Sequence, residues 1–173
     1  MLHHPAARVS LIALGAAAVF AAVSTASSPN AAEHAVASIV PYTAAHAGVV
    51  VGSGVNAHAR VLTPGRRARS IVKLRATGLS PGSRYGVHVH SGTCADYLGH
   101  YRYELSGPGT RDNEIWLDLT STSSGRARDR VTVPRFNPAG LSIVIHQMAN
   151  PDQVPDPTGH PGDRIACGNF TQG

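Results

Sequence analysis

The chain has 173 residues, a formal net charge of +5 and ten histidines. This length suits a single domain with its own core. The positive charge is too small and too scattered to indicate a nucleic-acid-binding protein, although it would favour a small anionic ligand. Neutral imidazole is a common protein ligand for zinc and copper, so the histidines make a metal site a candidate.

The N-terminus has the features of a secretory signal peptide. Arg8 precedes an apolar run over residues 11–23, and small residues at 24–26 offer a cleavage site after Ala26. A membrane anchor is the alternative, but the run is roughly 13 residues and a spanning helix needs about 20. We expect a signal peptide over residues 1–26 and a mature protein that has no membrane span and is secreted or held in the cell envelope.

Residues 27–47 are rich in Ala and Ser without a sustained period, which predicts a flexible linker. The folded domain is expected over residues 48–173. From Val49 onward, Gly and Pro separate short segments, and no amphipathic helical pattern is long enough to be convincing. This pattern of short segments between turn residues is typical of an all-β domain.

Two segments with period-two alternation stand near the middle of the chain. Ser70–Ala76 alternates as a strand with one wet face does, and residues 78–82 form a turn rich in Gly and Pro. Ser83–His90 also alternates, with its valines on one face and both of its histidines on the other. We interpret the two segments as a hairpin.

Five more segments have the composition of strands. They are Val55–Leu62, Ile115–Leu119, Arg126–Val133, Leu141–His146 and Ile165–Phe170. About seven to eight antiparallel strands would build a β-sandwich or a flattened barrel.

Cys94 and Cys167 are the only cysteines. In an exported protein, a single pair most simply forms a disulfide. The bond would close most of the domain into one loop and stabilise it by about 4 kcal/mol. A thiolate metal site is the alternative, but it needs both cysteines reduced.

The histidines of the predicted strands are candidate metal ligands. His88 and His90 are two positions apart, which on a strand points both imidazoles the same way with backbones about 7 Å apart. Two convergent imidazoles can bind one ion, but the pattern also fits two solvated histidines on an exposed face. His146 ends an apolar strand, where it is either a third ligand or a hydrogen-bonded histidine at a sheet margin. His100 lies in a loop that can fold back over His90.

These residues also occur in a recognisable order. The sequence resembles the copper/zinc superoxide dismutases in residues 86–90, Cys94, residues 99–101, residues 142–146 and residues 163–168. The resemblance covers about residues 49–170 and includes the strand and turn over residues 74–82. It implies a Greek-key β-barrel.

The resemblance also implies roles for single residues. His88, His90 and His146 would be copper ligands, and His100 would be the histidine that bridges copper to zinc in zinc-containing relatives. His100 would detach on copper reduction and carry a proton. Arg164 matches the arginine that draws superoxide to the copper, a role that suits its permanent charge. A plain surface arginine is the alternative for Arg164.

The chain departs from this family in its zinc half. No histidine lies between His100 and His146, so the zinc site of the family cannot be assembled from that loop. Asp112, Glu114 and Asp118 are available carboxylates, but solvated loop and strand charges are the simpler interpretation. We therefore expect copper as the cofactor and no zinc.

The expected function is copper-dependent dismutation of superoxide outside the cytoplasm. One alternative is an extracytoplasmic copper-binding or copper-storage module with little dismutase activity. Another is a structural sandwich with an idle metal site, which the presence of all four histidines and Arg164 disfavours. The sequence indicates no nucleic-acid partner and no particular oligomeric state.

Overall fold

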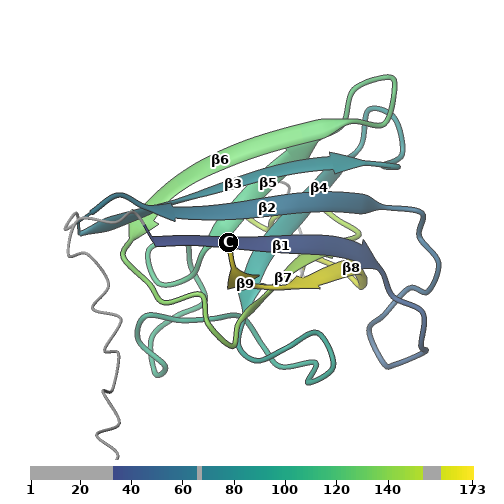
Figure 1. The fold of residues 1–173 in the computed structure, drawn as a ribbon. Coiled ribbons are helices and arrows are strands. Elements are labelled where there is room, and N and C mark those ends of the chain that lie inside the picture. The colour runs from purple at the N-terminus through teal and green to yellow at the C-terminus, as the bar shows by residue number, and fades with distance from the viewer. Residues whose placement is uncertain (1–32, 66–67, 154–160) are drawn as a thin grey trace, which may run out of the picture.

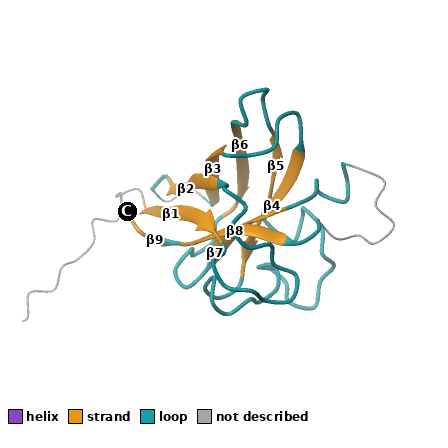
Figure 2. Cartoon of the chain, turned by 90° about the vertical axis from the view of Figure 1, so that its right-hand side faces the viewer, coloured by secondary structure: helices purple, strands orange, loops and turns teal. Residues whose placement is uncertain are grey.

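The structure is a computed structural model that describes residues 33–65, 68–153 and 161–173. The predicted signal peptide and residues 27–32 lie outside the described residues. Every regular element in the described part is a strand (Figures 1 and 2). The strands are β1 (Glu33–Pro41), β2 (Asn56–Thr63), β3 (Arg69–Thr77), β4 (Arg84–His90), β5 (Trp116–Thr120), β6 (Ala127–Pro134), β7 (Ser142–His146), β8 (Arg164–Asn169) and β9 (Thr171–Gln172).

The strands form one antiparallel sheet that curls into a flattened barrel. Its order is β5-β4-β7-β8-β1-β2-β3-β6, with β9 also paired to β1. Strands β1, β2, β3 and β6 make one wall, and β5, β4, β7 and β8 make the other (Figure 1). The two strands at the ends of this order, β5 and β6, meet where the Asp118 backbone N–H donates a hydrogen bond to the Asp129 carboxylate at 2.7 Å. The predicted all-β barrel of antiparallel strands is confirmed.

The core lies between the two walls, and burial follows the alternation of the sequence. Val72 and Leu74 of β3 are buried, while Lys73 between them is exposed. Strand β4 differs, because Val87, Val89 and the two histidines between and beyond them are all buried. The valines face the core. The loops that cover the outer face of β4 therefore shield its histidines from water.

The predicted linker over residues 27–47 is wrong for Glu33–Pro41, which forms β1. This strand pairs with β2 from Glu33↔Thr63 to Ile39↔Ala57. Ala35, Ala37 and Ile39 are buried in the core. The period of two is present in the sequence, but two of its three inward residues are alanines, which carry little of the strand signal.

The predicted hairpin of the third and fourth strands is also wrong. Strand β3 pairs with β2 and β6, whereas β4 pairs with β5 and β7. Leu79, in the connection, is 4% exposed and belongs to the core. The connection therefore crosses the end of the barrel from one wall to the other. Gly78 allows the crossing, because its φ is +76° and a Cβ would lie 2.2 Å from the Gly54 carbonyl oxygen.

The seven predicted strands and the predicted disulfide are confirmed. Each of the seven predicted strands forms, with ends within one residue of the expected bounds. Cys94 and Cys167 form a disulfide with a Cα–Cα distance of 5.8 Å. This bond ties the loop after β4 to β8. Within the described residues, we find no helix with the length and hydropathy needed to cross a membrane.

Candidate metal centre

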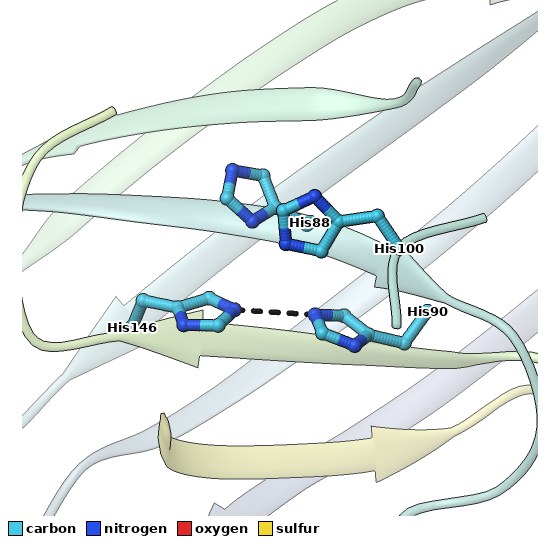
Figure 3. A group of neighbouring side chains, drawn as sticks. All are labelled: His88, His90, His100 and His146. Atoms are coloured by element: carbon cyan, nitrogen blue, oxygen red, sulfur yellow. Dashed lines mark hydrogen bonds between the residues drawn. The ribbon is translucent and has the colours of Figure 1, made fainter. Parts of the chain in front are cut away.

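Four histidines from three segments meet on the outer face of the β4–β7 wall (Figure 3). His88 and His90 come from β4, and His146 ends the neighbouring strand β7. His100 comes from the loop after β4, which returns to form an isolated bridge with His90. One nitrogen from each ring lies within 4.8 Å of the others. The structure thus brings together all four histidines that the sequence singled out.

The strand pairing explains how His146 reaches the cluster. The β7–β8 pairing changes register between Ile145 and His146, which is a β-bulge or similar irregularity. Such irregularities re-aim the side chain that follows them. Ile145 is fully buried in the core, whereas His146, 4% exposed, points into the cluster.

Backbone carbonyl groups orient two of the rings. His90 Nδ1 donates to the carbonyl oxygen of Leu98 at 2.8 Å, and His146 Nδ1 donates to that of Gly162 at 3.0 Å. A carbonyl oxygen only accepts, so the proton of each neutral ring must be on Nδ1. The Nε2 atom of each ring is then unprotonated, and its lone pair faces the cluster.

Side chains orient the other two rings. The Asn150 Oδ1 atom is 2.6 Å from His88 Nε2, and the Glu114 Oε2 atom is 2.5 Å from His100 Nδ1. Both oxygens accept these protons, which leaves His88 Nδ1 and His100 Nε2 as lone pairs. Outer partners of this kind fix the tautomer and direction of a metal-binding imidazole.

The inward nitrogens lack the partners that a metal-free core would require. His88 Nδ1 is buried and has no hydrogen-bond partner. His90 Nε2 and His146 Nε2 face each other at 3.1 Å (dashed in Figure 3), although both nitrogens are unprotonated and neither can donate a hydrogen bond. A cation between the rings would satisfy all of these atoms. The donor set therefore fits a metal ion, and imidazole suits copper and zinc.

Burial favours the neutral form of three rings of the cluster, those of His88, His90 and His146. Burial lowers the pKa of His146 to about 4, although the Gly162 carbonyl opposes the shift. Burial lowers the pKa of His90 further, and that of His88 well below its usual value. Metal binding requires the neutral ring, so a metal ion does not compete with protons for these three rings near pH 7.

Glu114 is the main correction to the sequence analysis, which interpreted it as a solvated charge. Its side chain is 1% exposed. Besides His100, it accepts hydrogen bonds from Trp116 Nε1 at 2.7 Å and Arg102 Nε at 2.9 Å. Burial raises the pKa of the carboxyl group, but the hydrogen bonds from His100, Trp116 and Arg102 outweigh it and leave the pKa below its usual range. Asp112 is exposed, as expected.

Asn150 is a further buried residue that the sequence analysis missed. In addition to its contact with His88, its amide donates to the Leu117 carbonyl at 3.0 Å and to the Asp118 carboxylate at 2.5 Å. Asp118 in turn pairs with Arg111 at 2.8 Å, so it is held in place rather than freely solvated. Asn150 follows the end of a strand, and no motif or period in the sequence marks it.

A cleft of about 830 Å³ opens over the histidines. Arg164 lines it, and its Nη2 atom donates to the Leu98 carbonyl oxygen at 2.8 Å. That carbonyl also accepts from His90, so one backbone group positions both a ring and a guanidinium. His46 and Tyr97 form a parallel stack at another part of the rim, with ring centroids 3.8 Å apart.

Comparison with known proteins identifies the family. The family model for copper/zinc superoxide dismutase (SODC) matches residues 55–170. The chain belongs to the copper/zinc superoxide dismutase family. The matched range does not include β1. It includes every histidine of the metal centre and both cysteines.

Two individual proteins are similar to the chain. The copper-zinc superoxide dismutase 2 of Aquifex aeolicus (strain VF5) is 28% identical over 120 residues, which cover 57% of this chain and 70% of the relative. The crystal structure of the clock protein EA4 is similar with a TM-score of 0.61 and 18% identity, and the match covers 82% of this chain and 95% of that one. At this identity, the second likeness shows the fold alone.

Proposed function

We propose that this chain binds one copper ion through His88, His90, His100 and His146 and dismutes superoxide outside the cytoplasm without zinc. The convergence of four lone pairs, each oriented by a separate acceptor, is the observation that carries the proposal. In the proposed reaction, two superoxide ions and two protons become dioxygen and hydrogen peroxide. The family membership supports this reaction.

The contacts of His100 support the absence of zinc. A bridging histidine needs both ring nitrogens for metals, but Nδ1 of His100 donates to Glu114. Arg102 binds the same carboxylate and places a fixed positive charge beside it. Among the residues that the structure describes, the four histidines are the one group of three or more His, Cys, Asp or Glu side chains placed to hold a metal ion. We propose that Glu114 and Arg102 hold His100 in place of a second metal.

The residues around the site have separate tasks. Copper held by the four histidines would supply one-electron redox chemistry. Arg164, at the cleft, attracts the anion with a charge that is permanent. His100 is the least buried of the four rings and lies on a loop, so it is the ring best able to release its Nε2 atom and hold a proton there. Glu114 accepts the hydrogen bond from His100 Nδ1 and so keeps that proton on Nδ1 during the exchange.

The cysteine pair supports the proposed location. A disulfide persists in oxidising compartments and is rare in the cytosol. Together with the proposed signal peptide over residues 1–26, it favours export. We place the start of the folded domain at β1 instead of residue 48.

The test compares copper-loaded, zinc-loaded and metal-free protein. We expect one copper per chain, a copper(II) electron paramagnetic resonance spectrum with nitrogen ligands, and superoxide decay faster than in protein-free buffer. His146→Ala should lose the copper. Arg164→Ala should keep the copper but react at least tenfold more slowly at low salt, because steering raises on-rates by about 10–1,000-fold. Arg84→Ala, at an exposed arginine on β4, is the matched control.

The outcomes separate the candidate functions. Copper binding without faster superoxide decay would favour the copper-storage alternative. One tightly bound zinc per chain that is lost in His100→Ala would contradict the copper-only proposal.

A further inference from the structure

The outer face of the wall opposite the metal centre carries a dense group of cations. Strands β2, β3 and β6 lie side by side there (Figure 1), and their inward residues fill the core. We call the exposed, outward cations of these strands the basic face. They are Arg60, Arg69, Lys73, Arg75, Arg128 and Arg130.

The strand register places these charges directly opposite one another. Arg75 is the pairing partner of Arg128. Two residues earlier in β3, Lys73 pairs with Arg60 of β2 on one side and with Arg130 of β6 on the other. Like charges in opposed positions destabilise a sheet. Folding alone therefore gives no reason for this arrangement.

No acidic side chain in the described part of the chain forms an ion pair with a cation of the basic face. The ion pairs of the described residues involve His100, Arg102 and Arg111, and none involves a cation of this face. Asp129, the acidic residue of β6, is the pairing partner of the core residue Leu74. Its carboxylate accepts a hydrogen bond from the Asp118 backbone N–H. The positive charge of the face is thus available to a partner.

We propose that the basic face docks on a membrane surface rich in anionic phospholipids. Neighbouring strands are about 4.8 Å apart and alternate residues about 7 Å apart, so the face measures about 10 by 20 Å. All of its cations project from one wall, and a planar array of phosphates can contact all of them together. A linear polyanion would follow one row at a time. Five of the six cations are arginines, whose planar fork binds phosphate oxygens in pairs.

The position of the metal centre is compatible with this docking. The four histidines and their cleft belong to the wall of β4 and β7, whereas the basic face belongs to the wall of β2, β3 and β6. A membrane on the basic face would leave the cleft open to solvent. A second copy of the chain cannot use the same face symmetrically, because its cations would repel those of the first.

The test is sedimentation of the purified full chain with vesicles. One set contains equal parts of phosphatidylglycerol and phosphatidylcholine, and the other contains phosphatidylcholine alone. We expect binding to the anionic vesicles at about 0.05 M salt and loss of binding at about 0.5 M salt, where the screening length falls to a few ångströms. Each cation at an anionic surface is worth about fivefold in affinity. The triple variant Arg75→Gln/Arg128→Gln/Arg130→Gln should therefore bind about 100-fold more weakly.

Matched variants keep the result interpretable. Replacing the same three arginines with lysine preserves charge and should preserve most of the binding. Arg84→Gln removes a charge from the other wall and should bind as the unmodified chain does. Thermal unfolding should show the glutamine variant at least as stable as the parent, because it relieves opposed like charges.

Several results would overturn the proposal. Equal binding to both vesicle types would exclude recognition of anionic lipid. No binding at low salt, or unchanged binding by a folded glutamine variant, would exclude the basic face as the docking site. Binding to heparin without binding to anionic vesicles would assign the face to a linear polyanion instead.

Discussion

Replacing the buried Glu114 with glutamine tests the role of its charge with almost no change in shape. The carboxylate accepts three hydrogen bonds, two at Oε2 from His100 and Trp116 and one at Oε1 from Arg102. Glutamine has one acceptor oxygen and an NH₂ group that only donates. The least costly arrangement keeps the oxygen toward His100 and Trp116, so the contact with Arg102 is lost.

The expected loss of stability follows from that one contact. A hydrogen bond between charged groups contributes about 1.5–3 kcal/mol. The Arg102 side chain is 38% exposed and can turn to water, so we expect a loss near the lower end, about 2 kcal/mol. In a domain of this size, that corresponds to a fall in Tm of about 5 °C.

The assay is thermal and denaturant unfolding of the metal-free protein across a range of pH. The folded-state pKa of Glu114 lies below its ordinary value of 4.5, so the ionised carboxylate stabilises the fold above that pH. This stabilisation is lost as the pH falls through the folded-state pKa, and the difference between parent and variant should shrink there. Glu104→Gln, at an exposed glutamate of the same loop, is the control.

Three results would refute this reasoning. A difference below about 0.5 kcal/mol at pH 7 would mean that the buried charge contributes nothing beyond a neutral amide. A difference that stays constant down to low pH would separate the effect from ionisation of Glu114. An equal loss in Glu104→Gln would show a general effect of charge.

Three further predictions concern other parts of the site. Asn150→Ala should cost about 3 kcal/mol of unfolding free energy and weaken copper binding about 10–100-fold in a chelator competition, because His88 Nε2 loses its acceptor. Replacing Cys94 and Cys167 with serine should cost about 4 kcal/mol in denaturant unfolding, while a copper titration still finds one site. The metal-free protein should lose at least about 3 kcal/mol between pH 7 and pH 4, because the unfolded chain protonates His146 near pH 6.5 and the folded chain only near 4, and the lowered pKa values of His88 and His90 add to the loss. A flat stability profile over that range would contradict the burial argument.

The sequence was informative wherever the signal was local. Alternation in two segments and strand-like composition in five more located seven strands to within one residue, because a strand with one buried face repeats every two residues. These signals failed for Glu33–Pro41, where Ala35 and Ala37 fill inward positions without a strong hydrophobic signal. The predicted pairing of β3 with β4 was also wrong, because strand pairing depends on where the chain crosses the barrel.

By itself, the sequence determined which residues could form the metal centre and the disulfide. The spacing of His88 and His90 on one strand face, and the resemblance that added His100 and His146, needed no coordinates. Only the tertiary structure decided how the rings are oriented, because their partners lie in distant segments. Glu114 looks like any loop carboxylate until the loop folds over His100 and removes it from water. The register that opposes the cations of the basic face is likewise a product of strand pairing, which no local pattern encodes.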